Sequence, residues 1–397
     1  MMKRLLHAIA VSATFTYVAA QADEPPRKLP PEIERAMKAA NDAAQPPAET
    51  APAPAFDIAS LSPHEGVYTI RNFKFKSGET LAELKSGYIT LGTPHHGKNG
   101  KVDNAVLLIH GTGGDRRSLM RAEFAGMLFT PGALLDAREY YIISVDSIGM
   151  GLSSKPSDGM HARFPKYDYD DMVKEQYTLL TKGLGVDHLR LIIGTSMGCM
   201  HSFVWGEAYA EYMDALMPLA CNAVEIAGRN RMWRKMSMDA ITLDPAWEGG
   251  EYKTQPINGI RAMDYLTLIA GSAPVRQQKQ FPTRDTADKY VDDWIAADLA
   301  DPETDANNQL YQLNASRNYD PSKGLGRIKA HVMWVNSADD FINPPELGMA
   351  EQQVKEIPHG KFVLLPISDQ TRGHGTHTMA AVWQNYLKEL LDESENP

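Results

Sequence analysis

The sequence Leu191-Ile-Ile-Gly-Thr-Ser-Met-Gly-Cys-Met200 contains the pattern Gly-x-Ser-x-Gly centred on Ser196. The apolar residues before the pattern predict a strand buried on both faces, and the residues after Ser196 predict a helix. A sharp turn between such a strand and helix projects the serine hydroxyl above the sheet, and Gly194 and Gly198 remove side chains that would obstruct it. The segment therefore predicts a nucleophilic serine at the carboxyl end of a parallel strand.

Short β-rich segments alternate with helical ones on both sides of this turn. We expect strands at residues 67–75, 84–91, 105–110, 140–146, 189–195, 214–220, 331–336 and 361–367, and helices at 170–184 and 345–357. The first two strands are expected to form an antiparallel pair. The continuous apolar runs in several of the others are typical of a parallel sheet. This order predicts an α/β fold with a mostly parallel, doubly wound eight-stranded sheet flanked by helices.

One interval of about 110 residues breaks the alternation, and a loop of that length without structure is improbable. Residues 221–330 carry helical patterns at 229–241, 260–269 and 283–299 and no strong strand pattern. We therefore expect a helical lid inserted over one edge of the sheet. The core then consists of residues 61–220 and 331–397.

A second glycine-rich turn follows the expected strand at 105–110, in the sequence His110-Gly-Thr-Gly-Gly114. Enzymes with a serine on a strand-to-helix turn place one oxyanion donor in such a loop and the other directly after the serine. We expect these donors to be the backbone N–H groups of Thr112 and Met197. A phosphate-binding loop is excluded because no Gly-Lys-Ser/Thr follows and no GxGxxG opens the helix.

A serine of this kind needs a histidine base and an acid that orients the histidine, and both follow it along the chain. Asp339 and Asp340 end the strand expected at 331–336, and we favour Asp340 over Asp339 from its spacing to the next helix. His374 lies between two glycines after the last strand, whereas His377 is expected to begin the C-terminal helix. We therefore predict a triad of Ser196, Asp340 and His374.

The composition excludes several classes of protein. The chain has 397 residues, of which 43% are hydrophobic and 23% charged, and its formal net charge is −10. This charge gives no electrostatic footprint for nucleic acid, so we expect a small-molecule substrate. No HExxH motif and no Cys/His cluster is present, and we expect neither a metal nor a cofactor. Whether Cys199 and Cys221 pair depends on geometry, which the sequence leaves open.

The N-terminus has the features of an export signal. Lys3 and Arg4 precede an apolar run of about 16 residues, which is shorter than the roughly 20 that span a membrane. We expect cleavage after Ala22, with Ala20 as the alternative, and a periplasmic or secreted protein with no membrane contact after cleavage. Removing residues 1–22 takes the formal charge from −10 to −12, because it removes two basic residues and no acid. Residues 23–60 are rich in Pro and Ala and are expected to form a tether.

Several motifs carry a resemblance to a known family. They are Gly194-Thr-Ser-Met-Gly-Cys-Met200, Asp239-Ala-Ile-Thr-Leu-Asp-Pro-Ala-Trp-Glu-Gly-Gly-Glu-Tyr252, Asp305-Ala-Asn-Asn308 and Asp340-Phe-Ile-Asn-Pro-Pro345. Over roughly residues 66–392 the chain resembles the homoserine O-acetyltransferase branch of the α/β-hydrolase superfamily. The resemblance implies an acyl-serine at Ser196, a helical lid over a tunnel and often a homodimer formed through the lid. Ser196, Asp340 and His374 match the triad of that family.

The sequence departs from the family pattern in its lid motif and in its export signal. Met238 stands where the family usually has an arginine that grips the carboxylate of homoserine, although Arg234 or Arg231 lies one turn earlier. Acetyl-CoA is cytoplasmic, so an exported enzyme is expected to pass its acyl group to water. We therefore predict an exported serine hydrolase acting on a carboxylic ester or related acyl compound. The alternatives are an O-acyltransferase and a catalytically idle ligand-binding protein.

Overall fold

The computed structural model describes residues 56–395. The predicted signal peptide at 1–22 and nearly all of the predicted tether at 23–60 lie outside the described residues. Within 56–395, no helix is both long and apolar enough to cross a membrane.

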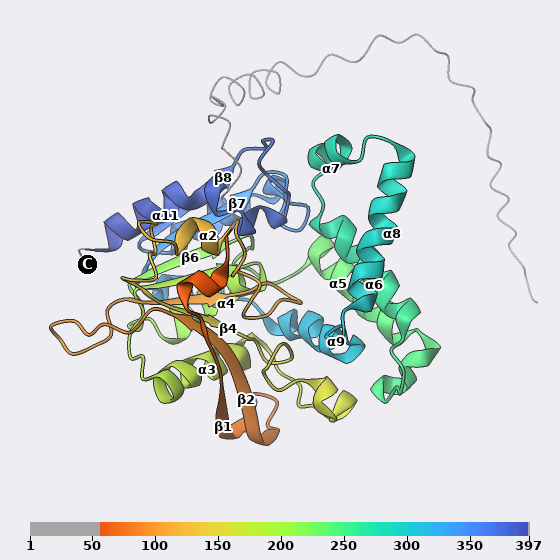
Figure 1. Ribbon diagram of the computed structural model, residues 1–397, viewed down its shortest axis with the longest axis horizontal. Coiled ribbons are helices and arrows are strands. Elements are labelled where there is room, and N and C mark those ends of the chain that lie inside the picture. The colour runs from red at the N-terminus through yellow and green to blue at the C-terminus, as the bar shows by residue number, and fades with distance from the viewer. Residues whose placement is uncertain (1–55, 396–397) are drawn as a thin grey trace, which may run out of the picture. The chain divides into compact units, whose positions relative to one another are not determined.

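The described residues are organised around one eight-stranded sheet with the strand order β1-β2-β4-β3-β5-β6-β7-β8 (Figure 1). β1 (His64–Lys74) and β2 (Thr80–Leu91) form an antiparallel pair, and β2 is also antiparallel to β4. The other strands run parallel: β3 (Ala105–Ile109), β4 (Tyr141–Val145), β5 (Leu191–Thr195), β6 (Ala215–Leu219), β7 (His331–Ser337) and β8 (Gly360–Leu365). The predicted α/β fold with a mostly parallel sheet is confirmed.

Helices cover both faces of the sheet. Successive residues of a strand point to opposite sides, and in the central strands the residues on both sides are apolar and need to be buried. Leu107 and Ile109 of β3 pack in one apolar cluster, which includes residues of α3 (Tyr169–Thr178) and α4 (Met197–Ala208). Val106 and Leu108 pack in a second cluster on the other face. Residues of α2 (Ala125–Leu128) and α11 (Ala380–Ser394) belong to this second cluster. Burial on both faces explains the continuous apolar runs in the central strands.

Five α-helices lie between β6 and β7, in the interval 221–330 that we call the insertion. They are α5 (Gly228–Thr242), α6 (Ile257–Gly271), α7 (Pro274–Gln280), α8 (Arg284–Ala300) and α9 (Ala306–Ala315). Figure 1 shows them grouped beside the sheet, and they bury a small apolar core of their own. That the insertion acts as a lid and that it joins two copies of the chain stay predictions.

The segment between β7 and β8 is less regular than predicted. The single helix expected at 345–357 is replaced by α10 (Met349–Gln353), with a short 3-10 turn on each side. Gly348 has a φ of 58° at the start of α10, a left-handed conformation that interrupts a continuous helix.

The two cysteines form a disulfide between Cys199 in the first turn of α4 and Cys221 just after β6. Their Cα atoms are 5.9 Å apart, within the range that a disulfide can bridge. The bond joins the helix that follows Ser196 to the next strand of the sheet. The pairing that the sequence left open is thus decided by the positions of β5 and β6.

Removing this disulfide is expected to destabilise the protein without unfolding it. The bond closes a loop of 22 residues, so a Cys199→Ala/Cys221→Ala variant should lose about 3 kcal/mol of unfolding free energy. Urea denaturation followed by fluorescence measures the loss. Wild-type protein treated with a thiol reductant in urea serves as the control and should show the same loss. An unchanged midpoint in both samples would contradict the prediction.

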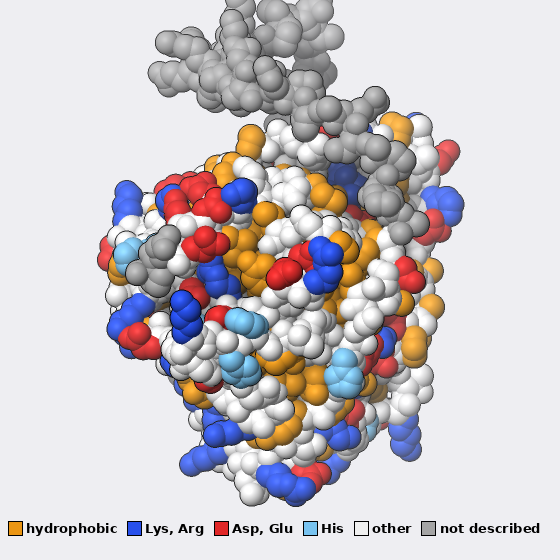
Figure 2. Space-filling model, turned by 60° about the vertical axis from the view of Figure 1, so that its left-hand side comes forward, with side chains coloured by type: hydrophobic (Ala, Val, Ile, Leu, Met, Phe, Trp, Pro, Cys, Tyr) orange, Lys and Arg blue, Asp and Glu red, His pale blue; other side chains and the backbone are white. Residues whose placement is uncertain are grey.

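On the face shown in Figure 2, Lys and Arg side chains are scattered among Asp and Glu side chains. They do not gather there into one broad basic surface of the kind that binds a phosphate backbone.

Candidate active site

Ser196 lies on the sharp turn between β5 and α4 that the sequence predicts. Its φ and ψ are 52° and −105°, a backbone conformation that residues other than glycine rarely adopt. A Cβ atom on Gly194 would lie 1.9 Å from the carbonyl oxygen of Gly198. A Cβ atom on Gly198 would lie 2.1 Å from the carbonyl oxygen of Ile109. Both glycines are therefore required for the turn to close above the end of the sheet.

The structure brings the three predicted triad residues into one hydrogen-bonded chain. His374 Nε2 lies 2.7 Å from Ser196 Oγ, and His374 Nδ1 lies 2.8 Å from Asp340 Oδ2. These residues come from three separate connections, which follow β5, β7 and β8 along the chain. Because the carboxyl ends of parallel strands meet at one edge of the sheet, residues far apart in sequence lie together there.

The surroundings of Asp340 keep its carboxyl group ionised. Burial by itself raises the pKa of Asp340, whose side chain is almost fully buried. The hydrogen-bonded His374 ring, the side chain of Asn343 and the N–H of Ile342 outweigh burial and hold the pKa below its usual value. Asn343 Nδ2 donates to Asp340 Oδ2 at 3.0 Å. Asn343 was not among the residues predicted for the site, although an amide three residues after the acid is a signal in the sequence.

Asp339 and His377, the alternatives for the acid and the histidine of the triad, lie outside the hydrogen-bonded chain. Asp339 accepts hydrogen bonds from Thr371 Oγ1 at 2.9 Å and from the N–H of Gly373 at 3.0 Å, so it anchors the loop that carries His374. His377 is half-buried beside His374, with 5.2 Å between ring centroids, and among the described residues it is His374, not His377, that is hydrogen-bonded to Ser196. Burial and the neighbouring His374 ring lower the pKa of His377 to about 3. The sequence predicted that His377 begins the C-terminal helix. In the structure it lies in a 3-10 turn before α11.

The predicted oxyanion donors flank the serine. Within residues 56–395, neither the N–H of Thr112 nor the N–H of Met197 donates a hydrogen bond. A Cβ atom on Gly111 would lie 3.3 Å from Ser196 Cβ, so the glycine-rich turn passes directly beside the serine. The N–H of Gly113 donates to Gln312 Oε1 of α9 at 2.8 Å, which ties this turn to the insertion.

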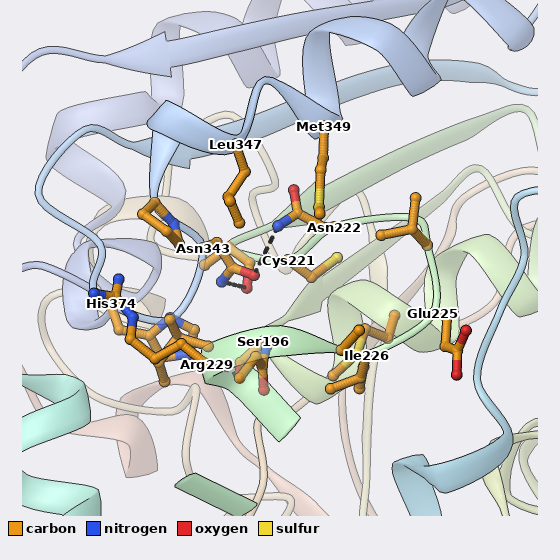
Figure 3. A pocket seen from close by; sticks show the side chains of 18 of the residues that line it. Ser196, Cys221, Asn222, Glu225, Ile226, Arg229, Asn343, Leu347, Met349 and His374 are labelled. Carbon is orange, nitrogen blue, oxygen red and sulfur yellow. Dashed lines mark hydrogen bonds between the residues drawn. The ribbon is translucent and has the colours of Figure 1, made fainter. Parts of the chain in front are cut away.

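Two cavities meet at Ser196 and His374. The first has a volume of about 430 Å³ and lies between the segment that joins β6 to α5 and the segment around α10. Figure 3 shows Ile226, Leu347 and Met349 lining it together with Ser196 and His374. The second cavity, of about 360 Å³, lies between the glycine-rich turn and helices α5, α6, α8 and α9. The insertion therefore supplies much of the wall around the serine.

Arg234 of α5 lines both cavities and is 2% exposed. Its guanidinium donates to Asn230 Oδ1 at 2.9 Å and to Ser316 Oγ at 3.4 Å. Burial lowers the pKa of Arg234, and no carboxylate contributes to its environment in the described part of the chain. Arg231 instead lines a separate pocket, and Met238 packs in the core of the insertion. Of the two arginines considered from the sequence, Arg234 is the one at the site.

Among residues 56–395, no group of three or more His, Cys, Asp or Glu side chains is arranged to hold a metal ion. The polar groups at the site are instead a nucleophile, a base, an acid and backbone N–H donors. That combination can form and break an acyl bond to a serine.

The chain matches the alpha/beta hydrolase fold family over residues 104–369, and it belongs to that family. Within the superfamily it is similar to the homoserine O-acetyltransferase branch. It is 28% identical to a homoserine O-acetyltransferase of Haemophilus influenzae over 70% of this chain and 85% of that protein. It is 29% identical to a probable acyltransferase of Methanothermobacter thermautotrophicus over 77% of this chain and 91% of that protein. The resemblance found in the motifs is confirmed.

Solved structures show the same fold at low sequence identity. An acetylester hydrolase from Corynebacterium glutamicum superposes with a TM-score of 0.71 at 20% identity, over 84% of this chain and 96% of that chain. A homoserine O-acetyltransferase from Bacillus anthracis superposes with a TM-score of 0.70 at 18% identity, over 84% of this chain and 98% of that chain. One architecture therefore carries proteins named as hydrolases and as transferases.

Proposed function

We propose that this protein is a serine esterase that takes an acyl group from a carboxylic ester onto Ser196 and passes it to water. The observation that carries the proposal is the hydrogen-bonded chain from Asp340 through His374 to Ser196 at the junction of two cavities. One relative is named a probable acyltransferase and one protein of the same fold an acetylester hydrolase, and acylation of the serine is chemistry that both activities require.

Each residue of the site has its own role in the formation and hydrolysis of the acyl-enzyme. His374 Nε2 accepts the proton of Ser196 Oγ as that oxygen attacks the ester carbonyl, while Asp340 holds Nδ1–H and stabilises the imidazolium. The N–H groups of Thr112 and Met197 stabilise the negative charge on the carbonyl oxygen. His374 then gives its proton to the departing alcohol, which leaves the acyl group on Ser196. Water repeats the sequence and releases the carboxylic acid.

Two features support water as the final acceptor. Met238 replaces the arginine expected for an amino-acid acceptor, and it is buried away from both cavities. The disulfide between Cys199 and Cys221 is typical of proteins in oxidising compartments, where cytoplasmic acetyl-CoA is absent. The disulfide also supports the proposed export by a signal peptide at residues 1–22.

Transfer to an alcohol is the second candidate, and two observations favour it. The curated relatives cited above are named as acyltransferases. Arg234 presents a buried cation that has no carboxylate partner among residues 56–395, so it would suit an acceptor that carries a carboxylate. In this case the alcohol takes the place of water in the second step, and the acyl-Ser196 intermediate is unchanged.

A fluorophosphonate label and a panel of p-nitrophenyl esters test the proposal. Mass spectrometry should locate the label on Ser196, and acetyl to octanoyl esters should release p-nitrophenol. Lack of labelling together with lack of turnover would favour the catalytically idle binding protein. Adding homoserine or glycerol then separates the two acceptors. A new acyl ester that forms faster than free acid would overturn hydrolysis and favour transfer.

A further inference from the structure

Two acidic side chains from the insertion lie in the wall of the second cavity. Asp264 of α6 and Asp298 of α8 line this cavity together with Ser196 and His374. Asp264 is 2% exposed, and its Oδ2 atom is buried without a hydrogen-bond donor within the described residues. An unsatisfied, buried carboxylate oxygen is costly unless a proton or a bound cation compensates it.

The two carboxyl groups influence each other's pKa. Burial and, to a smaller extent, the neighbouring Asp298 carboxylate together raise the pKa of Asp264 to about 7. Burial also raises the pKa of Asp298, whose other neighbours are Asp301 and the hydroxyl of Thr304 at 3.4 Å. A buried carboxylate and a half-buried one that repel each other are not both ionised at low cost unless a cation is present. Near pH 7 the pair must therefore share a proton or accept a positive charge.

The described part of the chain provides no such cation. No basic side chain contributes to the environment of Asp264 or Asp298. The basic groups that line the same cavity are Arg234 of α5, together with His374 and His377 after β8. Arg234 bonds to Asn230 and Ser316 instead. The negative charge is thus left available to whatever occupies the cavity.

Aromatic side chains complete this part of the wall. Trp233 of α5 and Trp294 of α8 line the same cavity. The faces of indole rings attract cations, and carboxylates combined with aromatic rings suit ammonium groups in particular. A cavity of about 360 Å³ has room for a small ester whose charged end lies several bonds from its carbonyl carbon.

We propose that Asp264 and Asp298 form a subsite that binds a positively charged ammonium group of the substrate while its ester carbonyl lies at Ser196. The inference rests on the proposed esterase function and adds a substrate class to it. Binding of the cation takes the place of the proton that the pair otherwise shares. Recognition should therefore strengthen as the pH rises through neutrality.

Two esters of the same shape test this subsite. Acetylcholine carries a trimethylammonium group, and 3,3-dimethylbutyl acetate replaces its nitrogen with carbon. The ratio of their kcat/KM values in one enzyme preparation does not depend on how much of the protein is folded. Wild-type enzyme should favour acetylcholine by about tenfold or more at pH 8, since a partly buried ion pair is worth more than one factor of ten.

Asp264→Asn and Asp298→Asn should each bring this ratio close to one. Asp292→Asn, on the exposed surface of α8, is the matched control and should keep the wild-type ratio. In the wild type the ratio should rise several-fold between pH 6 and pH 8, because a proton leaves Asp264 near pH 7. Effects of pH on the triad act on both esters and cancel.

Three results would overturn the inference. A wild-type ratio near one, or one that does not vary with pH, means that the cavity does not recognise the charge. Equal losses for both esters in Asp264→Asn mean that the pair only joins α6 to α8. These results leave the esterase proposal intact as long as the neutral ester is hydrolysed. Failure to hydrolyse either ester, together with no fluorophosphonate labelling, would remove both proposals.

Discussion

Replacing Ser196 with alanine is expected to lower kcat/KM for ester hydrolysis by at least about 10⁴-fold. The hydroxyl oxygen of Ser196 lies at the end of the hydrogen-bonded chain, next to His374 Nε2, and alanine cannot form the acyl intermediate. The backbone conformation at residue 196 is as strained for alanine as for serine, so the melting temperature should change little. Hydrolysis of a p-nitrophenyl ester and a thermal melt measure the two effects.

The matched control for this variant is Ser77→Ala, which removes an exposed hydroxyl in the turn between β1 and β2. It should retain wild-type turnover and fluorophosphonate labelling. If Ser196→Ala kept a substantial fraction of wild-type activity while folded, Ser196 would not be the nucleophile. The proposed acyl-enzyme chemistry would then be wrong.

Replacing Asp340 with asparagine is expected to lower kcat by about 10³- to 10⁴-fold, because an amide cannot hold the histidine in the required tautomer or stabilise its positive charge. Asp340 is hydrogen-bonded to His374 Nδ1 at 2.8 Å and keeps its negative charge through its other donors. The fall should appear in kcat more than in KM, since the acid does not line the substrate cavities. Steady-state kinetics at one pH are sufficient to measure it.

Asp339 offers a matched comparison because it is adjacent in sequence and has a different role. Asp339→Asn should retain most of kcat and lose about 1–2 kcal/mol of unfolding free energy, because it weakens hydrogen bonds to Thr371 and Gly373. Urea denaturation measures that loss. If the two variants exchanged these effects, Asp339 would be the acid of the triad.

The sequence was sufficient to predict the sheet and the turn that carries Ser196. Strands buried on both faces must be apolar throughout, and a turn this tight admits no Cβ atom at Gly194 or Gly198. These requirements concern only neighbouring residues, so they can be recognised from the residue types in the segment itself. Strand limits were less accurate: β1 begins at His64 and β2 at Thr80, three and four residues before the predicted starts. Hydrophobic alternation fades at exposed strand ends.

The sequence also narrowed the site to a few candidates, since the order of serine, acid and histidine follows the order of strands. Spacing along the chain favoured Asp340 over Asp339 but did not show which of the two contacts the histidine. Adjacent residues point in different directions once a loop closes, so Asp340 contacts His374 while Asp339 anchors the loop beneath it. The positions of β5 and β6 brought Cys199 and Cys221 within reach of each other, a relation between segments that no local pattern encodes.

The amino-acid sequence by itself determined the α/β core, the strained turn at Ser196 and the chain order of the triad. Only the tertiary structure decided which acid serves the histidine, that Arg234 rather than Arg231 lies at the site, and that Asp264 and Asp298 line the second cavity together. The physical reason is the same in each case. Backbone requirements act over a few residues. Charge pairing and cavity walls instead depend on how distant segments pack, and that packing is set by contacts between residues far apart in the chain.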